Sequence, residues 1–232
     1  MKYKYLLFDA DNTLFDFDAA EHSAHIRMCQ LHGLPYSPEN YALYHQCNAQ
    51  LWQELELGRC TKEFLLVERF HRWLTMLGLS GDPAAMHRDY AAALGQSCIL
   101  LPGALELCKT LAPDHEMYIL TNAVASVQRA RFAKSEITPY FKDVFISETI
   151  GAAKPDARFY DHVFSAVPGL TRENALVIGD SLSSDIRGAN NAGVPCLWFN
   201  LKGQTRPNDL RIDYEASTLA EILSIIQSFD QL

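Results

Sequence analysis

Four short polar groups in this chain of 232 residues have the residue types and spacing needed for acid–base and nucleophilic chemistry. Residues 9–13 read Asp-Ala-Asp-Asn-Thr, and residues 121–122 read Thr-Asn. Lys154 precedes a proline, and residues 179–181, Gly-Asp-Ser, are followed by Asp185. Aspartates can act as nucleophile, general acid or general base, whereas lysine and threonine side chains can stabilise developing negative charge.

Each group taken alone has an ordinary structural explanation. An aspartate after a strand commonly caps a turn or a helix, and a lysine most often lies on the solvent-exposed surface. Their shared position argues against that explanation, because all four groups lie at or just beyond the expected carboxyl ends of buried strands. Ligands of open parallel sheets bind beyond that edge. The sequence therefore indicates one site rather than four unrelated turns.

The apolar runs that precede these groups predict short strands buried on both faces. After residue 102 the runs alternate with helical patterns, which predicts a parallel sheet covered by helices on both sides. The first strand must belong to the same sheet, because a single strand is not stable alone. A loop over residues 202–213 is expected before a last strand and helix. The predicted strands are 5–8, 117–120, 144–146, 175–178 and 196–199.

Residues 18–95 have a different pattern, in which apolar side chains recur at helical spacing. Glycines at 33, 58 and 78 lie where helices should end, and Ser37-Pro38 and Asp82-Pro83 each place a capping side chain before a first-turn proline. We therefore predict an α/β fold with a Rossmann-like, doubly wound parallel sheet and an inserted all-helical cap of about four helices. Residues 1–16 and 96–232 form the predicted core domain, and residues 17–95 form the predicted cap domain.

The overall composition is that of an ordinary globular protein, with 48% hydrophobic and 21% charged residues. The formal net charge of −8 argues against a nucleic-acid polymer as partner, although a small phosphorylated molecule can still be held locally by a metal ion and a few cations. The six cysteines are scattered, as is typical of free thiols in a reducing compartment. Because no stretch has the length of a signal-peptide core or a membrane span, we expect a cytoplasmic protein without a membrane partner.

The ordered set of polar groups resembles the motifs of the haloacid dehalogenase (HAD) superfamily of aspartate-nucleophile phosphatases. The resemblance covers nearly the whole chain, and the helical segment matches the cap that this superfamily inserts after its first motif. It implies that Asp9 attacks phosphorus and forms an aspartyl-phosphate, and that Asp11 acts as acid and then as base. It also implies that Lys154, Thr121 and Asn122 bind the phosphoryl group.

The same resemblance implies a magnesium ion, and elementary electrostatics supports it. Two carboxylates about 4 Å apart repel by roughly 4 kcal/mol at an effective dielectric constant near 20, so a phosphate dianion needs help to approach. Mg²⁺ takes oxygen ligands and bridges protein carboxylates to phosphate. The expected ligands are the carboxylates of Asp9 and Asp180 and the backbone carbonyl of Asp11. Asp185 and Ser181 are expected behind them, orienting water or Lys154.

A narrower resemblance links the chain to the YjjG-type pyrimidine 5′-nucleotidases, which implies substrates such as dUMP, dTMP and UMP. In the cap, Asn48 and Trp52 are four residues apart and share a predicted helix face, so an amide and an aromatic plane could contact a nucleobase together. The segments that carry this resemblance are 8–18, 48–61, 69–73, 151–155, 184–193 and 197–200.

Three other functions remain open from the sequence. A sugar-phosphate or phosphoglycolate-type phosphatase, or a phosphomutase, would use the same core motifs and differ in the cap. A haloacid dehalogenase would need no metal, but the acidic residue at position 11 argues against it. A catalytically silent binding protein would be free to lose the motif residues, which are all present. The chain is expected to act as a monomer or a homodimer.

Overall fold

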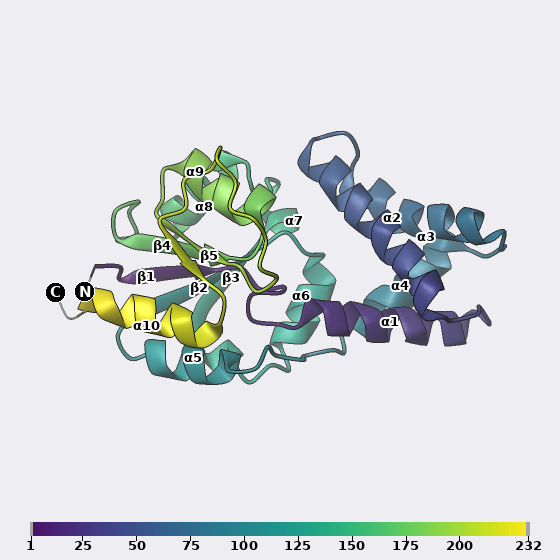
Figure 1. Ribbon diagram of the computed structural model, residues 1–232, viewed down its shortest axis with the longest axis horizontal. Coiled ribbons are helices and arrows are strands. Elements are labelled where there is room, and N and C mark those ends of the chain that lie inside the picture. Colours follow the sequence, from purple (N-terminus) through teal and green to yellow (C-terminus); the bar gives the residue numbers. More distant parts are fainter. Residues whose placement is uncertain (1, 231–232) are drawn as a thin grey trace. The chain divides into compact units, whose positions relative to one another are not determined.

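The computed structural model describes residues 2–230. These residues divide into two compact units, a core unit that runs up to Phe17 and resumes at Cys98, and a cap unit spanning Asp18–Ser97 (Figure 1). Within residues 2–230, no helix has both the length and the apolar character needed to cross a membrane.

The core unit is built on one parallel sheet, which confirms the predicted α/β fold. Among residues 2–230 the sheet has six strands in the order β3-β2-β1-β4-β5-β6, and every neighbouring pair is parallel. A chain order that reverses at β1 is the doubly wound arrangement, in which ligands bind where the order switches. The strands are β1 (Tyr5–Phe8), β2 (Glu116–Thr121), β3 (Phe141–Ile146), β4 (Ala175–Gly179), β5 (Cys196–Phe199) and β6 (Tyr214–Ala216).

The register at the centre of the sheet determines which polar residues meet. Phe8 on β1 is paired with Ile119 on β2 and with Ile178 on β4. Asp9, the residue after β1, is therefore level with Leu120 on β2 and Gly179 on β4. Thr121 and Asp180 each lie one residue further along. The three parallel strands thus deliver their polar residues to the same edge.

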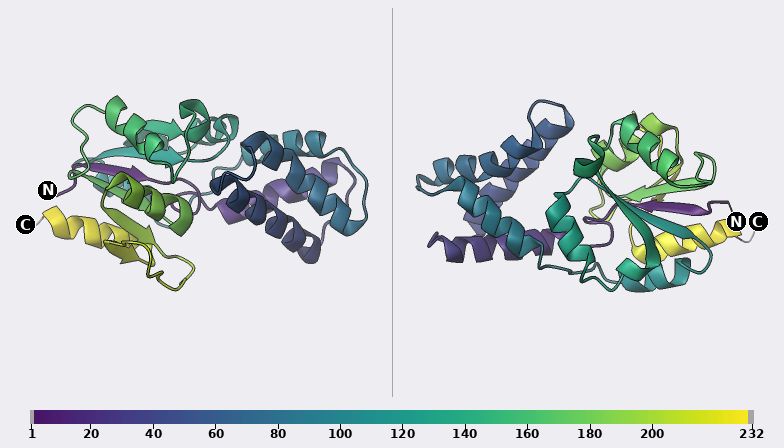
Figure 2. Two further views of the ribbon diagram at one scale, coloured as in Figure 1. Left: turned by 90° about the horizontal axis from the view of Figure 1, so that it is seen from above. Right: turned by 180° about the vertical axis from the view of Figure 1, so that it is seen from behind.

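Helices cover both faces of the sheet, because successive side chains of a strand point to opposite sides. Leu6 and Phe8 pack in one hydrophobic cluster with α5 and α10, whereas Tyr5 and Leu7 pack in a second cluster with α8 and α9. Figure 1 shows these two pairs of helices on opposite faces, and the view from behind in Figure 2 shows the twist of the strands between them. The core helices and short helical turns are α5 (Ala104–Leu111), α6 (Ala125–Phe132), η1 (Thr138–Tyr140), α7 (Ser147–Ile150), α8 (Ala157–Ala166), η2 (Leu182–Ile186), α9 (Arg187–Ala192) and α10 (Leu219–Asp230).

The cap unit, all of which lies within the described residues, contains four helices, the first of which begins one residue earlier, in the core unit. They are α1 (Phe17–Leu31), α2 (Pro38–Glu56), α3 (Lys62–Leu77) and α4 (Pro83–Leu94). Their boundaries follow the predicted capping signals. The Ser37 side chain accepts a hydrogen bond from the Asn40 N–H at the start of α2, and Asp82 accepts bonds from two N–H groups at the start of α4. Gly78 ends α3 in the left-handed conformation with a φ of 65°. The cap has its own aromatic core around Trp73, Tyr44, Phe70 and Tyr90.

The strand ends differ from the sequence-based prediction by one residue at both ends of β2 and at the end of β4, and by three residues at the start of β3. β3 begins at Phe141, three residues earlier than the predicted 144, because its first half carries the exposed residues Lys142 and Asp143 and therefore lacks an apolar pattern. β2 ends at Thr121 rather than before it, since the backbone of Thr121 still pairs with β3 at Ile146. Thr121 is consequently held by the sheet itself rather than by a loop.

Candidate active site

Asp9 lies at the carboxyl end of the central strand, where a tight turn begins. Its backbone N–H still bonds to the carbonyl of Ile178 at 2.8 Å, so the sheet fixes its position. Within the turn, the Leu14 and Phe15 N–H groups both donate to the Ala10 carbonyl, and Asn12 adopts a φ of 59°. This left-handed conformation is one that asparagine tolerates better than most residues.

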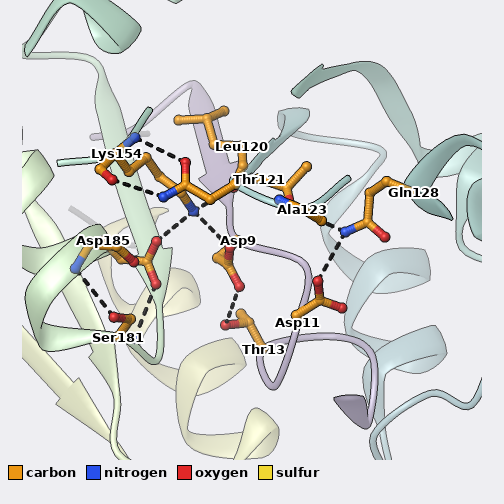
Figure 3. Close-up of polar contacts among 12 residues, drawn as sticks. Asp9, Asp11, Thr13, Leu120, Thr121, Ala123, Gln128, Lys154, Ser181 and Asp185 are labelled. Carbon is orange, nitrogen blue, oxygen red and sulfur yellow. Dashed lines mark hydrogen bonds and ion pairs between the residues drawn. The ribbon is translucent and has the colours of Figure 1, made fainter. Parts of the chain in front are cut away.

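The side chain of Asp9 has two unequal hydrogen bonds (Figure 3). Oδ1 accepts a bond of 2.7 Å from Lys154 Nζ, whereas Oδ2 accepts only a long bond of 3.4 Å from the Thr13 hydroxyl. Asp9 is 9% exposed. Its Oδ2 oxygen is therefore the one that is less committed to the protein.

Lys154 is a buried cation whose three donor bonds are all to oxygen. Besides Asp9, Nζ donates to Asp185 Oδ1 at 2.6 Å and to the Leu120 carbonyl at 2.6 Å, and the residue is only 2% exposed. The Asn122 amide holds the backbone of Lys154, donating to its carbonyl at 2.8 Å and accepting from its N–H at 3.0 Å. In this structure Asn122, which was predicted to bind phosphate, thus contacts the main chain of Lys154.

The loop after β4 brings two further carboxylates to the same place. Asp185 Oδ2 accepts a bond of 3.0 Å from the Ser181 N–H, while its other oxygen is bonded to Lys154. This approach requires Gly179, because a Cβ at that position would lie 2.3 Å from Asp185 Oδ2. The backbone of Asp180 is held in turn by the Trp198 indole, which donates to its carbonyl at 2.9 Å.

Oxygen atoms of Asp9, Asp180 and Asp185 all lie within 4.8 Å of one another, which makes them a candidate metal cluster among the described residues. Burial raises the pKa of Asp9 to about 7 although Lys154 opposes the shift, and burial followed by the charges of Asp9 and Asp185 raises the pKa of Asp180 well above its usual value. Burial alone would lower the pKa of Lys154, but Asp185 and Asp9 outweigh it and the pKa is raised.

These shifts describe a site with more buried negative charge than one lysine compensates. A donor set made only of carboxylate oxygens matches the preference of Mg²⁺, whose charge would favour the ionised carboxylates. The residues therefore fit the metal that the sequence predicts. Asp185 bonds Lys154 and Ser181 through separate oxygens, whereas Asp9 Oδ2 has only the 3.4 Å contact with the Thr13 hydroxyl.

Asp11 has a different environment, supplied by two residues of α6 that belong to none of the four sequence motifs. Its Oδ1 forms an ion pair with Arg131, and its Oδ2 accepts a bond of 3.2 Å from Gln128 Nε2. Gln128 Nε2 also donates to Thr121 Oγ1 at 3.1 Å (Figure 3), and Gln128 Oε1 accepts from Arg131 Nη1 at 3.1 Å. Gln128 and Arg131 are both fully buried.

Only a weak sequence signal pointed to these two residues. They are three positions apart and so share one face of α6, together with the buried Ala125 and Phe132. Glutamine and arginine side chains are usually exposed to solvent. Their position on the apolar face of a short helix after Thr121-Asn122 was the one sequence feature that could have indicated a role for them.

The cap residues predicted to contact a base have unequal exposure. Asn48 is 4% exposed, and its amide donates to Glu21 Oε1 at 2.7 Å and accepts from Arg69 Nη1 at 3.0 Å. Asn48 is thus hydrogen-bonded inside the cap, between the buried Glu21 carboxylate and the buried Arg69 guanidinium. Trp52 is half-buried on α2, with the Lys62 ammonium 6.0 Å from its ring centre.

Comparison with known proteins assigns the family. The model of the haloacid dehalogenase-like hydrolases matches residues 3–193. The chain therefore belongs to the haloacid dehalogenase-like hydrolase family and is an enzyme, as its sequence and site geometry indicated.

Individual relatives match over nearly the whole length. The chain is similar to the pyrimidine 5′-nucleotidase PynA of Streptococcus pneumoniae, at 36% identity over 97% of this chain and 96% of that protein. It is also similar to the pyrimidine 5′-nucleotidase YjjG of Escherichia coli, at 29% identity over 97% of this chain and 99% of that protein. Among solved structures, that of the HAD-hydrolase YfnB of Bacillus subtilis bound to magnesium matches with a TM-score of 0.94 and 33% identity, over 97% of this chain and 99% of that chain.

Proposed function

We propose that this enzyme is a Mg²⁺-dependent phosphatase that hydrolyses phosphate monoesters through an aspartyl-phosphate on Asp9. Its proposed substrates are pyrimidine nucleoside monophosphates such as dUMP, dTMP and UMP. The observation that carries the proposal is the pairing of two differently held aspartates, Asp9 on Lys154 and Asp11 on α6, at one sheet edge.

The unequal bonds of Asp9 suit a nucleophile. With Oδ1 bonded to Lys154 and Oδ2 in only a long contact with Thr13, Oδ2 attacks phosphorus while the bond from phosphorus to the ester oxygen breaks. Mg²⁺ held by Asp9, Asp180 and the Asp11 carbonyl would neutralise charge on the carboxylates and the phosphoryl oxygens. Lys154 supplies a second, permanent positive charge beside the reacting oxygen.

Asp11 provides the proton transfers. In the first step the protonated Asp11 gives its proton to the leaving alkoxide, and the product alcohol departs. In the second step the Asp11 carboxylate takes a proton from water as that water attacks phosphorus and releases Asp9. Thr121, at the end of β2, donates its hydroxyl hydrogen to a phosphoryl oxygen during both steps.

The nucleotide part of the proposal is supported by the relatives. PynA and YjjG, both named pyrimidine 5′-nucleotidases, each match 97% of this chain, cap included. Within the cap, Trp52 is half-buried and is the aromatic side chain proposed to stack on the base, whereas Asn48 is engaged by Glu21 and Arg69.

The test is a phosphate-release panel with Mg²⁺ that includes UMP, dUMP, dTMP, AMP, ribose 5-phosphate, phosphoglycolate and, for halide release, 2-chloropropionate. We expect kcat/KM for the pyrimidine nucleotides to exceed that for the sugar phosphates by roughly tenfold or more, which corresponds to about 1.4 kcal/mol of transition-state binding. A preference for sugar phosphates would reject the nucleotide assignment and keep the phosphatase chemistry. Halide release without phosphate release would reject both.

A further inference from the structure

We infer that Gln128, oriented by Arg131, is a positioning residue that holds the acid/base carboxylate of Asp11 and turns the hydroxyl hydrogen of Thr121 toward the phosphoryl group. The inference rests on the proposed phosphatase function and adds to it two residues outside the four motifs. Both residues lie on α6, and neither needs to touch the substrate.

The chemistry of the donors and acceptors determines how the Gln128 amide is oriented. An arginine side chain only donates hydrogen bonds, so the Gln128 atom that Arg131 Nη1 meets at 3.1 Å must be the carbonyl oxygen. The opposite atom is then the NH₂ group. Its two hydrogens serve the two oxygens within reach, Asp11 Oδ2 at 3.2 Å and Thr121 Oγ1 at 3.1 Å.

The orientation of Gln128 determines in turn what the Thr121 hydroxyl can do. Thr121 Oγ1 accepts from Gln128 Nε2 and also from the Ala123 N–H at 3.2 Å. Both partners can only donate at these contacts, so the two lone pairs of the hydroxyl are used. The hydroxyl hydrogen is therefore directed to a third group, and a phosphoryl oxygen at the sheet edge is such an acceptor.

Asp11 is held from both sides by the same helix. Arg131 pairs with Oδ1 and Gln128 bonds Oδ2, so the plane of the carboxylate is set by α6. Arg131 is itself immobilised, because it is fully buried and its guanidinium carbon lies 4.3 Å from the centre of the Phe15 ring. A proton-transfer group placed in this way has a defined direction toward the leaving oxygen.

A purely structural role for Gln128 would give different kinetics from a positioning role. p-Nitrophenolate leaves without needing a proton, whereas the ribose oxygen of UMP needs one. If Gln128 places Asp11 for proton transfer, its loss slows formation of the phosphoenzyme from UMP far more than from p-nitrophenyl phosphate. A general loss of folded protein would lower both rates equally.

The experiment compares single-turnover and steady-state kinetics of wild type and Gln128→Met with these two esters and Mg²⁺. Methionine keeps the length of glutamine but cannot donate. We expect phosphoenzyme formation to fall by about 10²-fold with UMP and by less than tenfold with p-nitrophenyl phosphate. We also expect a burst of p-nitrophenol before slow turnover, because the second step still needs Asp11 as base. Gln227→Met, at an exposed position of α10, is the matched control and should behave as wild type.

An equal loss with both esters and no burst would overturn the inference, as would wild-type kinetics in Gln128→Met. If Gln128→Met does not fold, the Arg131→Lys variant is used instead. Lysine keeps a positive charge beside Asp11 but cannot orient the Gln128 carbonyl in the same way. The same unequal loss is then expected, and an equal loss is again contradictory. Wild-type enzyme that releases phosphate from neither ester would reject the phosphatase proposal itself, so the two failures are distinguishable.

Discussion

Lys154 Nζ lies 2.7 Å from Asp9 Oδ1, and this bond joins two segments that are 145 residues apart in the chain. Lys154 is 2% exposed and Asp9 is 9% exposed, so both charges are removed from bulk water. Removing one partner of a buried ion pair is costly, because the other charge is left buried without compensation. Replacing both partners by apolar groups costs far less. The loss of either partner is therefore expected to destabilise the fold, in addition to its effect on the proposed chemistry.

Replacing the lysine tests this double role. We expect Lys154→Met to lower the free energy of unfolding by about 3 kcal/mol, because Asp9 and Asp185 lose their shared cation, and to remove measurable phosphate release. Urea unfolding followed by circular dichroism measures the first effect. Lys109→Met, at an exposed position of α5, is the matched control, and equal unfolding free energies for the two variants would contradict the expectation.

Gly179 tests how closely Asp185 must approach the end of β4. A Cβ at position 179 would lie 2.3 Å from Asp185 Oδ2 and 2.4 Å from its Cγ, so Gly179→Ala must push that carboxylate away from Lys154. We expect a loss of stability of roughly 1–3 kcal/mol, typical of overpacking, together with reduced kcat. Gly81→Ala is the control, since its Cβ would meet Leu74 Cδ1 at 3.1 Å and Met86 Sδ at 3.4 Å, both in flexible side chains that can move aside. An active, fully stable Gly179→Ala enzyme would argue against the contact.

His25 predicts a pH dependence of the cap. Burial, with a smaller contribution from His22, lowers the pKa of His25 from 6.5 to about 4. Because the unfolded chain then binds more protons between these pH values, the stabilisation is complete above pH 6.5 and is lost as the pH falls toward 4. At 1.36 kcal/mol per unit, the loss is about 3 kcal/mol.

Thermal melting of wild type and His25→Gln between pH 4 and 7 measures this effect. The curve of the variant should be flatter than that of wild type, with a residual slope from His87, whose pKa burial also lowers to about 4. Parallel curves for the two proteins would show that His25 is not the titrating group.

These predictions depend partly on residues that the sequence identified and partly on residues that only the structure revealed. Asp9, Thr121 and Asp180 could be anticipated because each follows an apolar run, and the ends of neighbouring parallel strands must meet. Gln128 and Arg131 could not, because their importance comes from α6 turning toward Asp11, a contact across 117 and 120 residues that no local pattern encodes.

The cap illustrates the same limit. Helical spacing places Asn48 and Trp52 on related faces, yet Asn48 is buried while Trp52 is half-exposed. Helical periodicity alone could not predict that Asn48 is buried and Trp52 is not. The partners that bury Asn48, Glu21 and Arg69, come from two other helices. Buried polar networks of this kind are settled by tertiary packing.

Metal dependence should be visible without turnover. We expect EDTA to abolish phosphate release and added Mg²⁺ to restore it. Mg²⁺ should also stabilise the folded enzyme, by about 2.7 kcal/mol at a concentration 100 times its Kd. Asp180→Asn should lose most of this thermal shift, whereas Asp114→Asn, at an exposed position before β2, should keep it. A full Mg²⁺ shift in Asp180→Asn would remove that carboxylate from the metal site.

Asp9 is proposed to carry the phosphoryl group, and trapping the intermediate tests this role most directly. The enzyme is mixed with p-nitrophenyl phosphate and Mg²⁺, quenched in acid within the first turnover and reduced with borohydride, which converts an aspartyl-phosphate to homoserine. Peptide mass spectrometry should find homoserine formed from Asp9, and the Asp9→Asn variant should show neither the product nor turnover. Homoserine at another aspartate, or continued phosphate release by folded Asp9→Asn, would contradict the account.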